Sequence, residues 1–139
     1  HGRLSSYCDV DGAKVEHIDF SEPYSAGLRR DLIAAAARAG IAVVDGGCYG
    51  ATQGPRLETR AEITRMRRDG CDLVGMTGMP EAALARELGL EYACIVLVAN
   101  WAAGCDPNGA GEISLDEIFG HLAAATTQVP RLIAALLAI

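Results

Sequence analysis

Three short polar stretches of this sequence carry side chains that could bind and act on a small ligand. The first, residues 47–59, holds Glu58 at a strand-to-helix junction, where a carboxylate can point at a bound molecule. The second, residues 75–81, combines the Thr77 hydroxyl with free backbone amides at a helix start, which together make a natural anion site. The third ends an apolar run at Asn100, whose side-chain amide both donates and accepts hydrogen bonds.

Each stretch also has a purely structural interpretation when it is taken alone. Glu58 could serve only to complement the positive end of the helix that follows it. Thr77 could cap a helix while Met76 contributes soft apolar surface to the core. Asn100 could simply tie down a loop. The residues by themselves leave both interpretations open.

The order of the expected elements decides where these stretches lie in the fold. Apolar periodicity, two capping boxes and glycine stops such as Gly40 predict helices over residues 23–39, 59–68, 80–88 and 114–128, with Pro130 breaking or kinking the last one. Short apolar runs predict strands over residues 41–44, 73–76 and 92–99. This alternation indicates an α/β fold. Ligands gather at the carboxyl ends of strands in such folds, which points to residues 46–59, 75–80 and 100–104.

The composition excludes several classes of partner. The 139 residues suit one domain, and the formal net charge of −6 argues against nucleic acid, because a phosphate backbone needs a basic face. No apolar run reaches the roughly 18 residues needed to cross a membrane, and no secretory signal opens the chain. The five cysteines are odd in number and none are closely spaced, so neither a disulfide framework nor a zinc site is expected. A reducing cytoplasm fits these observations best.

Four segments taken together carry a family resemblance that none of them carries alone. They are His17–Tyr24, Thr52–Glu62, Asp72–Ala82 and Tyr92–Asn100. The motifs GPRLETRAEI and VGMTGMPEA inside them are highly specific, and they resemble the trimeric purine nucleoside phosphorylase family with its 5'-methylthioadenosine phosphorylase branch. The sequence is most similar to the bacterial branch that acts on S-methyl-5'-thioinosine.

The resemblance implies a fold and a reaction. The fold is an α/β architecture with a mixed sheet flanked by helices. The reaction is phosphorolysis, in which inorganic phosphate attacks the anomeric carbon and the purine leaves. Methylthioinosine would give hypoxanthine and 5-methylthioribose 1-phosphate. Because the transition state resembles a ribocation, the demand on the protein is electrostatic; phosphate is a co-substrate and no metal or other cofactor is implied.

Residue roles follow from the resemblance, position by position. Met76 matches the residue that contacts the ribose, and Thr77 matches a residue that contacts phosphate. Leu57 stands where the family usually has a Phe that packs on the base. Glu58 and Asn100 match the pair that reads a 6-oxopurine, and Asn100 with Thr77 would take part in catalysis.

Two further sets of positions bear on the choice of substrate. Ala102 stands where adenosine-type members carry a second Asp. An apolar face of the last long helix carries Leu115, Ile118 and Phe119 at helical spacing, where ordinary nucleoside phosphorylases place a His near the 5'-hydroxyl. This face could instead pack into the core, as such faces usually do. The nearest His, His121, lies off the face. A 5'-methylthioadenosine phosphorylase and an inosine/guanosine phosphorylase are the alternatives.

One departure from the family is large. Family chains are nearly twice this length, and their N-terminal half carries a Gly-rich phosphate loop, an Arg-His pair and another Thr at the phosphate. Residues 1–139 are therefore expected to be the C-terminal part of a single domain without the phosphate-site half, and to be inactive alone. A nucleoside-binding remnant without catalysis is a further alternative. A homotrimer is also expected, with Arg3–Tyr7 approaching a neighbouring active site.

Overall fold

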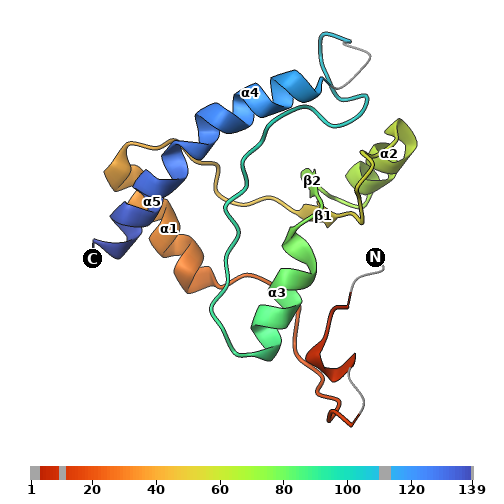
Figure 1. The fold of residues 1–139 in the computed structure, drawn as a ribbon, viewed down its shortest axis with the longest axis vertical. Coiled ribbons are helices and arrows are strands. Elements are labelled where there is room, and N and C mark those ends of the chain that lie inside the picture. Colours follow the sequence, from red (N-terminus) through yellow and green to blue (C-terminus); the bar gives the residue numbers. More distant parts are fainter. Residues whose placement is uncertain (1–3, 10–11, 110–113, 139) are drawn as a thin grey trace.

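A small parallel sheet lies among five α-helices in the computed structural model, which describes residues 4–9, 12–109 and 114–138 (Figure 1). In chain order the elements are the 3-10 helix η1 (Tyr7–Asp9), α1 (Ala26–Ala39), β1 (Tyr49–Ala51), α2 (Arg60–Arg68), β2 (Leu73–Gly75), α3 (Gly78–Glu87), α4 (Leu115–Thr126) and α5 (Gln128–Leu137). The predicted α/β class is confirmed, and each of the four predicted long helices is present with shifted ends.

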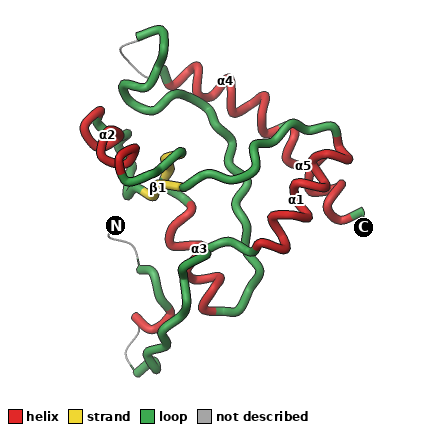
Figure 2. Tube along the Cα trace, turned by 180° about the vertical axis from the view of Figure 1, so that it is seen from behind, coloured by secondary structure: helices red, strands yellow, loops and turns green. Residues whose placement is uncertain are grey.

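The sheet positions two of the three predicted site stretches. Strands β1 and β2 are parallel, with Tyr49 opposite Leu73 and Ala51 opposite Gly75. Their carboxyl ends therefore open at the same edge, where β1 leads into residues 52–59 and β2 leads into the turn at the start of α3. The tube in Figure 2 shows how short these yellow strands are beside the green connecting loops.

Local capping explains where the helices begin and end. The Ser25 hydroxyl accepts from the amide of Leu28 at the start of α1, and Gly40 stops that helix in the left-handed conformation, at φ 65°. At α2 the full capping box between Thr59 and Glu62 is formed, as predicted. The predicted break near Pro130 falls at the α4–α5 junction, so that Pro130 lies within the first turn of α5.

Two of the predicted strands are wrong. Residues 41–44 and 92–99 run as irregular chain and join no ladder among the described residues. A strand needs a hydrogen-bonded neighbour, and apolar composition alone does not supply one. The two segments instead line a groove of about 790 Å³, and several of their apolar side chains are exposed, Val44 at 92% and Val98 at 68%.

The core is small and lies where α1 meets α5. Ala35 and Ala36 are fully buried against Leu132. Two arginines tie these helices together across the contact: Arg38 donates to the carbonyl of Ala135, and Arg131 donates to the carbonyl of Ala39, both at 2.8 Å. Within the described ranges, no helix is long and apolar enough to cross a membrane.

Candidate functional site

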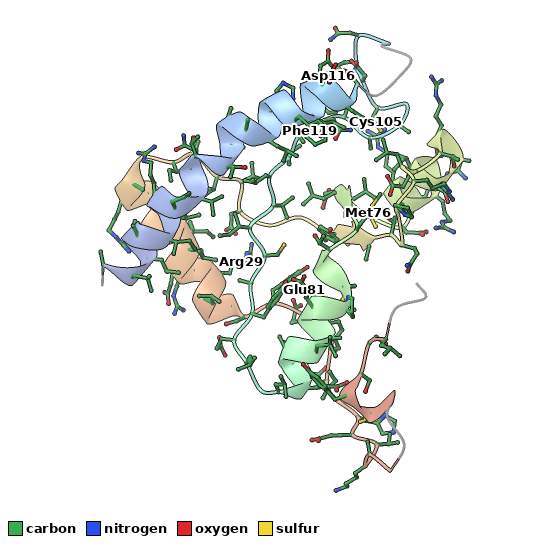
Figure 3. All side chains as sticks on the ribbon, viewed as in Figure 1. Arg29, Met76, Glu81, Cys105, Asp116 and Phe119 are labelled. Atoms are coloured by element: carbon green, nitrogen blue, oxygen red, sulfur yellow. The ribbon has the colours of Figure 1, made fainter. Side chains whose placement is uncertain are left out.

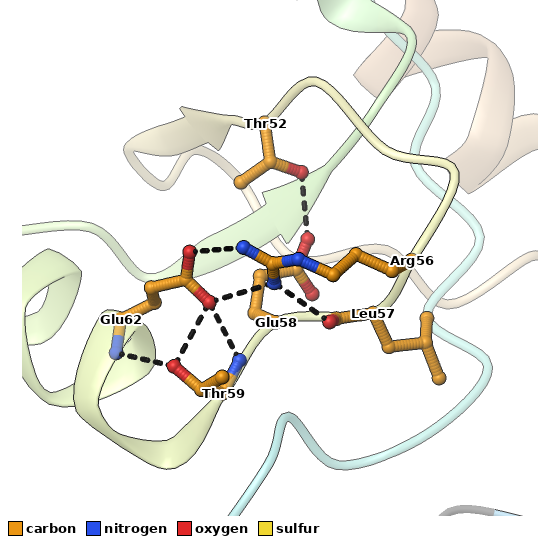
Figure 4. A network of polar contacts seen from close by, with 6 residues as sticks. All are labelled: Thr52, Arg56, Leu57, Glu58, Thr59 and Glu62. Carbon is orange, nitrogen blue, oxygen red and sulfur yellow. Dashed lines mark hydrogen bonds and ion pairs between the residues drawn. The ribbon is translucent and has the colours of Figure 1, made fainter.

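The loop after β1 is held in shape by hydrogen bonds that begin at Thr52. The Thr52 amide donates to the carbonyl of Gly75 over 2.9 Å, which continues the β1–β2 pairing by one residue. Its hydroxyl donates to Oε1 of Glu58 over 2.6 Å (Figure 4). Because Glu58 is half-buried and one of its oxygens is fixed in this way, its carboxylate has a defined orientation at the edge of the sheet.

A second carboxylate in the loop, Glu62, is fully engaged in local structure. The Arg56 guanidinium donates two hydrogen bonds to the Glu62 carboxylate, over 2.9 and 2.8 Å. The amide and the hydroxyl of Thr59 also donate to this carboxylate, over 2.7 and 2.9 Å. The Arg56 hydrogen bonds, followed by those from Thr59, hold the pKa of Glu62 far below its ordinary value of 4.5. Glu62 therefore shapes the loop and satisfies the Arg56 charge, while Glu58 is the carboxylate that can meet a ligand.

The turn between β2 and α3 differs from the sequence prediction in one respect. The amides of Thr77 and Gly78 are not free, because both donate to the hydroxyl of Tyr49 over 3.3 Å. These two backbone amides are therefore engaged within the turn. The Thr77 side chain is exposed and forms no capping bond at the start of α3, which leaves the hydroxyl as the candidate anion-binding group of this turn.

Met76 connects this turn to the loop that carries Glu58. A Cβ added at Gly54, which has a φ of 63°, would overlap the Met76 sulfur, so that the close approach requires glycine there. Figure 3 shows Met76 between the short sheet and α2. Leu57, in the same loop, exposes 41% of its surface. The residues predicted to bind ribose (Met76) and to pack on the base (Leu57), and one of the two predicted to read it (Glu58), thus lie on two adjoining segments.

The third predicted stretch lies in the irregular chain that carries Asn100 and Ala102. Asn100 is exposed, and its side-chain amide donates to the carbonyl of Trp101 over 2.7 Å. In the described part of the chain no hydrogen bond joins Asn100 to Glu58, so the predicted pair does not interact directly. The loop does approach α2, because a Cβ at Gly104 would lie 3.1 Å from Cγ of Arg60. Ala102, half-buried, accepts from the amide of Cys105 in this loop.

Helix α4 is joined to the third stretch by its histidine. The His121 ring nitrogen Nδ1 lies 2.6 Å from the carbonyl oxygen of Ala99, directly before Asn100. Leu115 and Phe119 expose 60% and 65% of their surface, and Ile118 is half-buried. In Figure 3 Phe119 lies on the side of α4 that faces the loop carrying Cys105. The apolar face is therefore not packed into a core within the described chain.

Two residues that organise the site were not assigned a role from the sequence. They are Thr52, which orients Glu58, and Tyr49, which holds the turn before α3. Both contacts depend on the parallel register of β1 and β2. The position of Thr52 directly after a strand was the available signal, since side chains there face the ligand edge.

Comparison with known proteins identifies the family. The description "Phosphorylase superfamily" belongs to a family model that matches residues 3–138. This chain belongs to the phosphorylase superfamily. Among its curated relatives, a "Probable S-methyl-5'-thioinosine phosphorylase" of Xanthomonas campestris pv. campestris is 62% identical over 132 residues, covering 95% of this chain and 52% of the relative. A "Probable 6-oxopurine nucleoside phosphorylase" of Thermococcus kodakarensis is 51% identical over 94 residues, covering 68% of this chain and 35% of the relative.

Solved structures of nucleoside phosphorylases share the fold. A mutant of adenosine/methylthioadenosine phosphorylase from Schistosoma mansoni in complex with adenine superposes with a TM-score of 0.85 at 25% identity, covering 99% of this chain and 52% of that one. Methylthioadenosine phosphorylase from the same organism, also in complex with adenine, superposes with a TM-score of 0.81 at 27% identity. The match covers 89% of this chain and 48% of that one. The chain spans about half the length of the relatives it matches.

Proposed function

We propose that the gene product containing this chain, called the full-length protein below, cleaves S-methyl-5'-thioinosine with inorganic phosphate. The products are hypoxanthine and 5-methylthioribose 1-phosphate. The observation that carries the proposal is the fixed carboxylate of Glu58, which is oriented by Thr52 beside the turn of Met76 and Thr77. The relatives named for this substrate, at 62% and 60% identity, support it.

Glu58 and Asn100 are proposed to select a 6-oxopurine. A 6-oxopurine carries an N–H group at N1 that donates a hydrogen bond to a carboxylate, whereas adenine offers a bare acceptor at N1. Asn100 donates its side-chain amide to the base and so stabilises the negative charge that develops as the bond to the sugar breaks. Leu57 offers its exposed side chain to the face of the base. Ala102 supplies no second carboxylate, in keeping with a 6-oxo substrate.

The sugar and the phosphate are assigned to the turn before α3. Met76 covers one face of the ribose, and the Thr77 hydroxyl donates to phosphate. A phosphate oxygen forms a bond to the anomeric carbon while the bond to N9 of the purine breaks, and the base leaves with the bonding electrons. These steps need charge stabilisation and positioning from the protein, and no cofactor beyond the co-substrate phosphate is proposed.

The remaining groups around the phosphate are proposed to come from the half of the family fold that lies outside this chain, since the chain spans about half the length of its relatives. We also propose a homotrimer in the cytoplasm, with the segment Arg3–Tyr7 near a neighbouring active site; Arg3 itself lies outside the described residues. Light scattering of the full-length protein checks the assembly, and a fully active monomer at micromolar concentration would contradict it.

The decisive test is phosphorolysis by the full-length protein. Purified protein is incubated with methylthioinosine, methylthioadenosine or inosine, with and without phosphate, and release of the base is followed. Phosphate-dependent release of hypoxanthine from methylthioinosine, at the highest kcat/KM of the three, is expected. A preference for methylthioadenosine would overturn the base assignment, and nucleoside binding without any turnover would favour the non-catalytic alternative.

A further inference from the structure

We infer that Tyr49 is a positioning residue for phosphate, because it holds the turn that presents the Thr77 hydroxyl. The inference rests on the proposed phosphorolysis and deepens it. Tyr49 begins β1, opposite Leu73, and its side chain reaches along β2 to the start of α3. There its hydroxyl accepts hydrogen bonds from the amides of Thr77 and Gly78, each over 3.3 Å.

Two glycines make room for this side chain. A Cβ added at Gly75 would overlap the Tyr49 hydroxyl, and one added at Gly78 would lie 3.0 Å from Cε1 of the ring. Neither glycine has a positive φ, so backbone conformation does not require glycine at either position. The space taken by Tyr49 does. Tyr49, Gly75 and Gly78, from three different elements, are therefore fitted to one another around the turn.

The hydroxyl holds a turn that lies ahead of the regular helix. The residue before α3, Thr77, forms no side-chain capping bond, and Met79 interrupts the start of α3 with a non-helical φ of −123° and ψ of 138°. The amides of Thr77 and Gly78 therefore precede the regular part of the helix, and Tyr49 supplies their acceptor. Because the Thr77 hydroxyl is not used for capping, it is available for an anion, while the turn that carries it stays fixed at its backbone.

This arrangement predicts a specific kinetic defect. Tyr49→Phe in the full-length protein keeps the ring between the glycines and removes only the acceptor. We expect the KM for phosphate to rise about tenfold, as for the loss of hydrogen bonds that fix a turn, while the KM for methylthioinosine stays within about twofold. Tyr92→Phe is the matched control, because it also removes one phenolic hydrogen bond, 2.7 Å to Glu81, on the same helix. Its phosphate KM should not change.

Each outcome decides the inference separately from the proposed function. A wild-type protein that releases no base with phosphate defeats the proposed function itself. An active wild type with an unchanged phosphate KM in Tyr49→Phe overturns the role of Tyr49. A lower phosphate KM in that variant also overturns it, because the uncovered amides would then be the phosphate ligands. If Tyr49→Phe does not fold, Gly75→Ala displaces the hydroxyl instead, and the same selective rise in phosphate KM is required.

Discussion

The hydroxyl of Thr52 donates a 2.6 Å hydrogen bond to Oε1 of Glu58, six residues farther along the same loop. The bond closes the loop upon itself at the carboxyl edge of the sheet, where the Thr52 amide is already paired with the carbonyl of Gly75. The position of the Glu58 carboxylate is therefore fixed by the end of strand β1. The Glu58 side chain therefore has a preorganised orientation. It loses less conformational entropy when a ligand binds than a side chain without this hydrogen bond would.

Replacing Thr52 by Val tests this orientation with little change in volume. Val cannot donate to Glu58, and the loss of one hydrogen bond, worth about 1 kcal/mol, should raise the KM for methylthioinosine roughly fivefold. The KM for phosphate should not change. Thr52→Ser retains the hydroxyl and should behave like the wild type in steady-state assays of the full-length protein. Equal nucleoside KM values for the Val and Ser variants would show that Glu58 needs no anchor.

The interactions of Glu62 should make the stability of the folded protein depend on pH. Arg56 and Thr59 lower the pKa of this carboxyl in the folded protein. A lowered folded pKa means that the stabilisation is complete above the ordinary value of 4.5 and is lost as the pH falls below it. Glu62→Gln should therefore lower the melting temperature of the full-length protein near neutral pH, and this difference from the wild type should shrink under acidic conditions.

A second variant identifies the cause of that behaviour. Arg56 makes the first contribution to the lowered pKa of Glu62, so Arg56→Met should move the loss of stability to higher pH than in the wild type. The capping bonds from Thr59 are left in place. A melting-temperature difference between wild type and Glu62→Gln that stays constant from neutral pH to below pH 4.5 would refute the linkage.

Local signals predicted the helices well because the physics of a helix end involves neighbouring residues only. The capping box of Thr59 and Glu62 and the left-handed Gly40 are formed as expected. The strands over residues 41–44 and 92–99 were not predicted correctly, because a strand is completed by a partner distant in sequence. Apolar composition indicated that these segments face other protein, and their exposed side chains line the groove instead.

For the candidate site, the sequence motifs predicted which residues to consider but did not predict the contacts that hold them in place. The motifs located Glu58, Met76 and Thr77, and the structure places them on two adjoining segments. The contacts of Tyr49 could not be predicted, because they depend on the register between β1 and β2 and on space left by two glycines. Register is a tertiary property that no local pattern in this chain specifies.

Asn100 offers a test of base selection. The family resemblance implies an Asp at this position in adenosine-type members, and a carboxylate accepts a hydrogen bond from the purine where an amide can donate one. Asn100→Asp should lower kcat/KM for methylthioinosine and raise it for methylthioadenosine, with a combined shift of tens to hundreds of fold, as for one or two mismatched buried polar groups. Competition between the two substrates measures the ratio directly. An unchanged ratio would remove Asn100 from base recognition.

The last prediction concerns the apolar face of α4, where Leu115 and Phe119 are 60% and 65% exposed and Ile118 is half-buried. The bond between His121 and the carbonyl of Ala99 holds this helix beside the stretch that begins at Asn100. His121 is thereby engaged with the backbone, so the face presents no histidine of its own to a 5'-hydroxyl. An apolar wall can bury a methylthio group, and it leaves a hydroxyl without a partner.

These two effects act in the same direction on substrate choice. Burying a methyl group and a sulfur is worth on the order of 1–2 kcal/mol, and stripping a hydroxyl of water costs a similar amount. Their sum predicts that kcat/KM of the full-length protein favours methylthioinosine over inosine by roughly a hundredfold or more. Leu115→His restores a donor and should raise kcat/KM for inosine while lowering it for methylthioinosine. Leu115→Met, which stays apolar, is the control. Equal efficiency in the parent protein, or no gain for inosine in Leu115→His, would reduce the assignment to a general 6-oxopurine phosphorylase.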